Sequence, residues 1–389
     1  MQRNLLVGIG TSQADSPMEA GRDAATTALA ALSGEPPALV IVFASVSYDL
    51  PALVSSIRAV TGSAPLVGAT SCGQFHEGSY VPVGSGVQVL VLSAGPYRFG
   101  ATSAQGLSAE PEATGRAVAR GARLAAGGEL PPHAALLLFT DGLAGNQRAV
   151  LNGIYAVAGA AVPVVGGSSA DDRRFTGTFV FHDDQVLRDS AVAVWIGSEQ
   201  PLGVICKHGW LPRGLPMMVT NVEGANVREI SGRPAMEVYR EHAGDGLEGS
   251  RAGVYSAAMA SYPLGLIEPD GSYVIHAVRL GDTDDDLVSF NPLPPFAAVS
   301  VMTGQPDDLL AITEPLVADA LRGRDARVML TFSCAGRQDI LLDRVPEEVV
   351  RLQAAAGDVP VFGFYTYGEF ARTRSVAGCH NATIAALAL

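Results

Sequence analysis

Two charged side chains next to expected strand ends could bind a small zwitterion. Arg337 follows the tetrapeptide SCAG at the end of one strand pattern, and Glu369 follows YTYG at the end of the next. An arginine offers a planar pair of donors to a carboxylate, and a glutamate accepts hydrogen bonds from an ammonium group. We therefore predict an amino acid or another carboxylate as ligand. The alternative is that Arg337 and Glu369 pair with one another, as buried charges normally do.

Further candidates come from the carboxy-terminal half. Tyr365 and Tyr367 alternate with other residues in GFYTYGEF, so both should lie on one face of a strand and could wall a pocket; core packing is the alternative for one of them. His380 and Asn381 open the motif HNAT and are expected to hold the backbone or the pocket wall through hydrogen bonds. Arg279, in VIHAVRLGD, could contact the ligand or pair with a carboxylate such as Asp282.

Small hydroxyl side chains occupy similar turns in the first half of the chain. Ser71 lies in PLVGATSCG, and Ser169 lies in VPVVGGSSADD. Either hydroxyl could bind the ligand, or it could satisfy loop backbone groups. Asn146 and Arg148, after TDGLAG, are expected to start a helix whose first amides face the same end of the sheet.

Histidines and cysteines leave two alternative functions open. The chain has no CxxCH motif, but haem bound without a covalent link needs only one axial histidine and an apolar pocket, so the histidines leave haem binding open. Cys72 lies four residues before His76, and Cys334 also lies at a turn, so a cysteine-dependent hydrolase is conceivable. The motifs GxSxG and CxxC are absent, and no GxGxxG follows an expected strand. We therefore expect a binding protein without metal, cofactor or catalysis.

The elements that must position these residues repeat three times along the chain. Each repeat has an apolar strand, a helical pattern, a second strand that closes in a Gly-rich turn, and a further strand. The first strands are expected at 38–45, 134–141 and 327–334, the helices at 50–60, 148–158 and 347–355, the second strands with their turns at 64–75, 162–175 and 358–370, and the last strands at 86–93, 190–196 and 382–389. We predict an α/β fold of related strand–helix–strand–strand units with mixed sheets covered by helices. The alternative is that any α/β protein yields apolar strands ending in glycine.

Composition restricts the class of partner. With 389 residues, 48% of them hydrophobic and 17% charged, the chain can bury a large core and is expected to form two domains. Its net charge of -13 and pI near 4.9 argue against nucleic acid and anionic membranes as partners. No signal peptide or membrane-spanning segment is predicted, and four widely spaced cysteines fit a reducing cytoplasm.

A change of pattern between residues 197 and 215, rich in proline, places the domain boundary, so we predict domains at 1–205 and 206–389. The segments PLVGATSCG and GVQVLVLS resemble the amino-terminal FIST domain, and GRPAMEVYREH, YPLG, SCAGR, GFYTYGEF and HNAT resemble the carboxy-terminal FIST domain, in that order. The resemblance implies a sensory, ligand-binding module of bacterial signal transduction, for which amino acids and other small molecules are proposed ligands. A signalling kinase or cyclic-dinucleotide enzyme encoded separately would be its partner. One subgroup of this family binds haem and senses nitric oxide, which keeps that alternative open.

Overall fold

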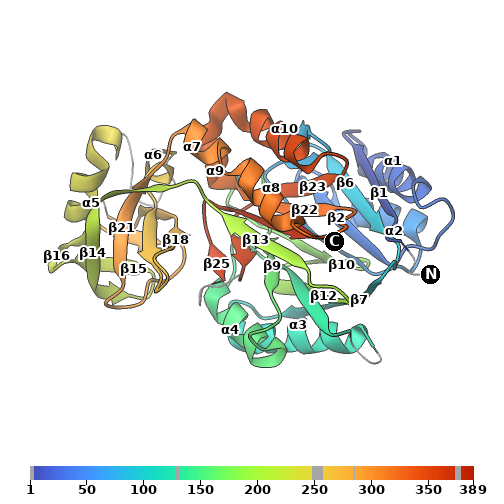
Figure 1. Ribbon diagram of the computed structural model, residues 1–389, viewed down its shortest axis with the longest axis horizontal. Coiled ribbons are helices and arrows are strands. Elements are labelled where there is room, and N and C mark those ends of the chain that lie inside the picture. The colour runs from blue at the N-terminus through green and yellow to red at the C-terminus, as the bar shows by residue number, and fades with distance from the viewer. Residues whose placement is uncertain (1–3, 128–130, 248–256, 284, 373–377) are drawn as a thin grey trace.

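The computed structural model describes residues 4–127, 131–247, 257–283, 285–372 and 378–389 (Figure 1). Within these residues, three α/β units form a body, and a further sheet is inserted into the third unit. Figure 1 shows the inserted sheet at the left of the body. The α/β class predicted from the sequence is confirmed.

The elements of the body follow one another in a repeated order. The first unit contains β1 (Val7–Ser12), α1 (Pro17–Ala30), β2 (Leu39–Ala44), α2 (Leu50–Thr61), β3 (Leu66–Thr70), the hairpin β4 (Gln74–His76) and β5 (Ser79–Val81), and β6 (Val87–Leu92). The second contains β7 (Tyr97–Gln105), α3 (Pro111–Ala125), β8 (His133–Thr140), α4 (Gln147–Ala158), β9 (Val164–Ser168), the hairpin β10 (Val180–His182) and β11 (Gln185–Leu187), and β12 (Ser190–Ser198).

The third unit begins with β13 (Gly203–Lys207) and resumes after the inserted sheet. It contains α7 (Pro306–Leu310), α8 (Thr313–Leu321), β22 (Met329–Cys334), α9 (Ala335–Leu341), η2 (Leu342–Arg344), α10 (Val345–Ala356), β23 (Val361–Thr366), β24 (Glu369–Ala371), β25 (Cys379–His380) and β26 (Ile384–Ala388). Each unit thus contains the predicted strand–helix–strand–strand core, together with an earlier strand and helix and an edge hairpin.

The three units complete one another's sheets. Their strand orders correspond: β1-β6-β2-β3, β7-β12-β8-β9 and β13-β26-β22-β23. A hairpin from another unit then extends each sheet: β10 pairs with β3, β24 pairs with β9, and β4 pairs with β23. Because every unit both gives and receives a hairpin, the exchange closes into a cycle and makes the body a single structure with approximate threefold symmetry.

The three Gly-rich turns occupy equivalent places, as the sequence repeat predicts. Gly68, Gly166 and Gly363 lie in β3, β9 and β23, each paired in parallel with the central strand of its unit. A Cβ at any of the three would come within 1.9–2.1 Å of a carbonyl oxygen of that strand. Glycine is therefore required at these three positions by the close approach of the neighbouring strand.

One detail of the repeat was predicted wrongly. The sequence pattern ends the second turn at Phe175, but the residue that faces Gly68 across the sheet is Phe181, just as Phe75 faces Gly363 and Phe370 faces Gly166. A longer loop in the second unit, between β9 and β10, displaces the equivalent position.

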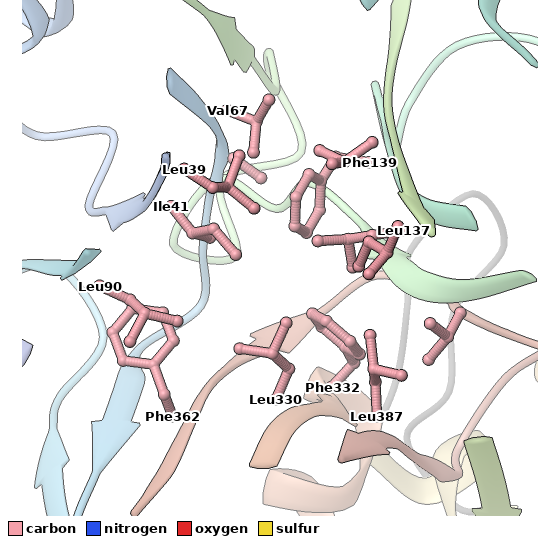
Figure 2. Close-up of a cluster of buried hydrophobic side chains, with 14 of the residues drawn as sticks. Leu39, Ile41, Val67, Leu90, Leu137, Phe139, Leu330, Phe332, Phe362 and Leu387 are labelled. Atoms are coloured by element: carbon pink, nitrogen blue, oxygen red, sulfur yellow. The ribbon is translucent and has the colours of Figure 1, made fainter. Parts of the chain in front are cut away.

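The inner faces of the sheets pack around a shared core (Figure 2). Phe43, Phe139 and Phe332 come from equivalent positions on β2, β8 and β22, and all are fully buried. Their ring centroids are 5.6, 6.0 and 6.5 Å apart. Such an aromatic cluster contributes both buried area and edge-to-face contacts to stability.

Backbone hydrogen bonds beyond the strand ends follow the same cycle. Each joins one unit to another through residues at equivalent positions: Cys72 N to Tyr365 O at 2.9 Å, Ala170 N to Thr70 O at 2.8 Å, and Tyr367 N to Ser168 O at 3.3 Å. The ends of β3, β9 and β23 are therefore held in a defined arrangement.

The inserted sheet contains β14 (Leu211–Glu223), β15 (Asn226–Ile230), β16 (Arg233–Pro234), β17 (Leu264–Ile267), β18 (Tyr273–His276), β19 (Val278–Leu280), β20 (Leu287–Ser289) and β21 (Ala298–Thr303), with α5 (Ala235–Ala243), η1 (Gly244–Leu247) and α6 (Ala257–Ala260) between them. It has a hydrophobic cluster of its own. The predicted boundary at 205/206 falls inside β13, which pairs with β26; as a division between domains it stays a prediction. No helix in the described part of the chain has the length and apolar character that crossing a bilayer requires.

Candidate functional site

A cavity of about 420 Å³ lies between the inserted sheet and the body. One wall comes from β19, β20 and residues 289–292, and another comes from the ends of β22 and β23 and the turn after β25. The loop before α4 closes the side, and the predicted helix start is confirmed there: Asn146 Oδ1 accepts from Ala149 N at 3.2 Å and caps α4. Ligands commonly bind beyond the carboxyl ends of strands, where this cavity lies.

Asn381 lies in the cavity wall and connects the body to the inserted sheet. Its buried Oδ1 accepts from Asn291 Nδ2 at 2.9 Å and from Ala277 N at 3.3 Å, and its backbone N donates to Ile275 O at 3.0 Å. The side-chain Nδ2 lies on the side of Gly368, where a Cβ would be 3.6 Å away. The amide therefore presents donors at the wall while its oxygen holds the inserted sheet.

Arg279 reaches the cavity from the inserted sheet. It lies in β19, is half-buried and donates from Nη1 to Leu280 O at 2.9 Å. Among the residues that the structure describes, no carboxylate forms an ion pair with it, Asp282 included. A guanidinium in a cavity wall without a carboxylate partner is suited to bind an anionic group.

Tyr367 lines the cavity, but Tyr365 does not, which corrects the prediction that the two share a strand face. Strand β23 ends at Thr366, so the alternation stops before Tyr367. The Tyr367 hydroxyl donates to Asp171 Oδ1 at 2.6 Å, and its ring stacks on Phe175 at 4.9 Å. Tyr365 is fully buried away from the cavity, and its hydroxyl donates to Glu348 Oε1 at 3.1 Å.

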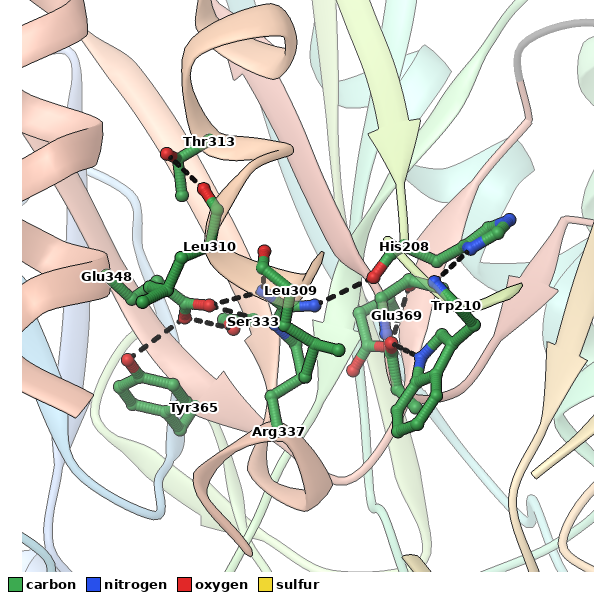
Figure 3. Close-up of polar contacts among 12 residues, drawn as sticks. His208, Trp210, Leu309, Leu310, Thr313, Ser333, Arg337, Glu348, Tyr365 and Glu369 are labelled. Atoms are coloured by element: carbon green, nitrogen blue, oxygen red, sulfur yellow. Dashed lines mark hydrogen bonds and ion pairs between the residues drawn. The ribbon is translucent and has the colours of Figure 1, made fainter. Parts of the chain in front are cut away.

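The predicted meeting of Arg337 and Glu369 is wrong, because Arg337 has another partner (Figure 3). Arg337 is fully buried, and its Nε donates to Glu348 Oε2 at 2.9 Å. It also donates to the backbone oxygens of His208 at 3.0 Å and Leu309 at 2.9 Å. Arg337 therefore joins α9 and α10 to the connection before β14 and to α7, and it does not line the cavity.

Glu369 is fully buried beside the cavity but does not line it. Its Oε1 accepts from Thr366 Oγ1 at 2.6 Å, and its Oε2 accepts from Thr383 N at 3.2 Å and Thr383 Oγ1 at 2.9 Å. Burial raises the pKa of this carboxyl to about 7, against the lowering effect of the threonine hydrogen bonds. Thr366 and Thr383 thus engage both carboxylate oxygens, and Glu369 is not part of the cavity wall that a ligand would contact.

The remaining predicted residues serve the backbone. His380 is buried, its Nε2 lies 2.8 Å from Ala371 O, and burial lowers the pKa of its ring. Ser71 Oγ donates to Ala44 O at 3.2 Å, and Ser169 Oγ donates to Thr140 O at 3.0 Å. None of the three lines the cavity. For both serines, the partner is a backbone oxygen at the end of the neighbouring strand, Ala44 in β2 or Thr140 in β8, and not a ligand.

Two cysteines line the cavity, Cys334 and Cys379, each 6% exposed. Burial raises the pKa of Cys379 to about 12 and the pKa of Cys334 well above its usual value. Both thiols are therefore protonated at neutral pH, the less nucleophilic form. No histidine is among the described residues of the lining, and the described residues contain no group of three His, Cys, Asp or Glu side chains suited to a metal ion.

Sequence reasoning missed several residues of the lining. Leu143, Phe290 and Asn291 lie in loops without a motif. The pair Asn291-Pro292 is a turn signal. Nothing in the sequence places that turn opposite Asn381, because 90 residues separate the two asparagines.

Comparisons with known proteins identify relatives over most of the chain. An uncharacterized protein of Mycobacterium tuberculosis is 25% identical over 388 residues, which cover 97% of this chain and 96% of the relative. An uncharacterized protein of Mycobacterium bovis is 26% identical over 219 residues, which cover 53% of this chain and 55% of the relative, so that match spans about half of each protein. Crystal structures of a chorismatase and of a cyanuric acid hydrolase from A. caulinodans align over 99% and 98% of this chain and 98% and 99% of those chains, with TM-scores of 0.37 and 0.36 and 11% identity.

Models of protein families match both halves of the chain. The FIST N domain matches residues 38–233, and the FIST C domain matches residues 235–372. The first match includes the Gly-rich turns of β3 and β9, and the second includes Arg279, β22, β23 and Tyr367. The chain therefore belongs to the FIST family, with a FIST N domain followed by a FIST C domain.

Proposed function

We propose that this chain is an intracellular sensory protein that binds a small molecule in the cavity between the inserted sheet and the body. FIST domains are associated with sensory signal transduction and small-ligand binding. The observation that carries the proposal is the cavity itself: about 420 Å³ lies within the range of about 300–1,000 Å³ typical of small-molecule sites. Its lining combines apolar side chains with a few polar groups, as such sites usually do.

The ligand would be an amino acid or another carboxylate. Arg279 supports this choice, because it is half-buried in the lining and has no carboxylate partner among the described residues. A carboxylate would accept two hydrogen bonds from its planar donor group. Arg279 takes the role that the sequence predicted for Arg337, because the Arg337 guanidinium is already paired with Glu348.

Signalling would follow from the two-sided construction of the cavity. A ligand that contacts both the inserted sheet and the body favours the arrangement in which the two lie together, and it shifts that equilibrium by its difference in affinity between the states. The partner that reads this change would be a signalling kinase or cyclic-dinucleotide enzyme encoded separately. A reducing cytoplasm suits the four cysteines, all free thiols.

We further propose binding without catalysis and without haem. Both cavity thiols are protonated because burial raises their pKa. The cavity has no histidine among its described lining residues that could serve as an axial ligand. A haem-based sensor remains the alternative that a spectrum decides, as argued in the Discussion.

Thermal unfolding in the presence of a panel of amino acids, other carboxylates, amines and neutral compounds tests the function. A ligand at one hundred times its Kd should add about 2.7 kcal/mol to the free energy of unfolding. Ala277→Phe, which fills the cavity, should abolish that gain, and Ala125→Phe, on the exposed face of α3, should leave it intact. The function is wrong if no compound stabilises the native chain more than it stabilises Ala277→Phe.

A further inference from the structure

Resting on the proposed ligand-binding function, we propose that the cavity selects a carboxylate with an apolar body and discriminates against amino acids. The inference starts from the charges of the wall. Two of the described lining residues are charged, Arg173 and Arg279, and both are cationic. No aspartate or glutamate is among the described residues that line the cavity.

Arg279 is the guanidinium that remains for the ligand. Arg173 is held elsewhere: its Nη1 donates to Asp339 Oδ1 at 2.7 Å, and its Nη2 donates to Ala335 O and to Gln338 Oε1 at 3.1 Å. Arg279 makes a single hydrogen bond to a backbone oxygen within the described structure. The described part of the wall therefore offers one cation to an anionic ligand.

Three carboxylates accept hydrogen bonds from lining residues but do not line the cavity themselves. Asp171 accepts from the backbone N–H groups of three residues of its own loop, at 2.6–2.9 Å, as well as from Tyr367. Asp141 accepts from Leu143 N at 3.1 Å, from Asp189 N at 2.7 Å and from Thr178 Oγ1. Glu369 accepts from the two threonines described above. Each is already satisfied by protein donors, so none is left to balance an ammonium group.

The uncharged polar groups favour the same ligand. Because Asn381 Oδ1 is engaged with Asn291 and Ala277, the amide presents its Nδ2 donors at the wall, where a carboxylate can accept from them. Gln147 Oε1 is a buried acceptor without a partner in the described structure. It is neutral, and one neutral acceptor cannot compensate the desolvation of a full positive charge.

The rest of the wall is apolar and remains accessible. Leu143, Phe175 and Phe290 line the cavity and are 46, 44 and 42% exposed. Large apolar side chains that remain this exposed in a concave wall are typical of ligand sites, where the ligand covers them. An aryl or alkyl body would pack against these side chains while its carboxylate meets Arg279.

Isothermal titration with three compounds of similar skeleton tests the inference. 3-Phenylpropionate carries the carboxylate alone, L-phenylalanine adds the ammonium group, and 3-phenylpropanamide lacks the charge. We expect 3-phenylpropionate to bind at least tenfold more tightly than either of the others. Arg279→Gln should weaken its binding by about 10- to 100-fold. The control Arg98→Gln, an exposed arginine on β7, should leave binding within about twofold.

The outcomes separate the inference from the function beneath it. If L-phenylalanine binds as tightly as 3-phenylpropionate, the ligand class is wrong while the sensory function stands. Equal affinity of the amide, or unchanged binding by Arg279→Gln, also overturns the class. If none of the three compounds binds, the class is wrong, and the panel with Ala277→Phe then decides whether the cavity binds any small molecule.

Discussion

Asn381 and Asn291 form a hydrogen bond of 2.9 Å that joins the last turn of the body to the inserted sheet. The acceptor oxygen of Asn381 also receives the backbone N–H of Ala277, at 3.3 Å. All three residues line the cavity. The groups that hold the inserted sheet in place thus line the proposed ligand site, so a bound ligand would be linked to the position of the sheet through Asn381.

Replacing Asn381 with alanine should lower the free energy of unfolding by about 1–3 kcal/mol, because two donors lose their acceptor. Chemical denaturation of the apo protein measures this. Asn152→Ala, at an exposed position of α4, is the matched control and should change stability by less than about 0.7 kcal/mol, the range of helix propensity. An Asn381→Ala variant as stable as this control would contradict the role assigned to the hydrogen bond.

The buried pair of Arg337 and Glu348 should dominate the stability of the third unit. Arg337→Ala leaves an uncompensated carboxylate at a site with no exposure, and we expect a loss of about 3–5 kcal/mol in the apo protein. The double variant with Glu348→Ala should be less destabilised than the sum of the single variants. The control Arg351→Ala, which removes an exposed ion pair with Glu347, should cost about 0–1 kcal/mol.

The same double-mutant design separates Arg337 from Glu369. Because each has its own partners, Arg337→Ala and Glu369→Gln should be additive within about 0.5 kcal/mol. A large coupling energy between Arg337 and Glu369 would instead indicate that the two side chains form an ion pair. That result would contradict the separate partners described above.

Glu369 should make stability depend on pH. Its pKa in the folded protein is raised to about 7 by burial, above the ordinary value of 4.5, so the folded state binds a proton more tightly than the unfolded state. Stability from this group is therefore fully present below pH 4.5 and is lost as the pH rises toward 7, at about 1.4 kcal/mol per pH unit and about 3 kcal/mol in total.

Glu369→Gln isolates this effect, because its amide can donate to Thr366 and accept from Thr383 without a charge. Denaturation curves of both proteins should be measured between pH 4 and 8. As the pH rises, the native chain should lose stability relative to Glu369→Gln. A difference that stays constant with pH would show that Glu369 has the same pKa in the folded and unfolded states and would contradict the shift.

The purified protein should be colourless. The described lining of the cavity contains no histidine, and the lone histidine of the third-unit turn, His380, has its Nε2 at a backbone oxygen. A visible absorption spectrum checks this directly. A Soret band that survives gel filtration and disappears when one histidine is replaced would instead establish the haem-based alternative.

Local pattern alone predicted the repeated units and their turns. Strand and helix periodicity, and glycine where two backbones approach closely, are properties of a few neighbouring residues, so Gly68, Gly166 and Gly363 and the cap of α4 at Asn146 could be located without a structure. The resemblance of short motifs such as SCAGR and HNAT was likewise sufficient to indicate the family that the domain matches establish.

Tertiary structure decided which side chains meet. Arg337 pairs with Glu348, eleven residues away, because α9 and α10 fold back on one another, and no spacing rule distinguishes that carboxylate from Glu369. The cavity exists because a sheet inserted between β13 and α7 packs against the ends of β22 and β23. Arg279 and Asn381, about a hundred residues apart in the sequence, therefore line one cavity. Contacts between distant segments depend on the packing of whole elements, and that packing is not encoded in any short stretch of residues.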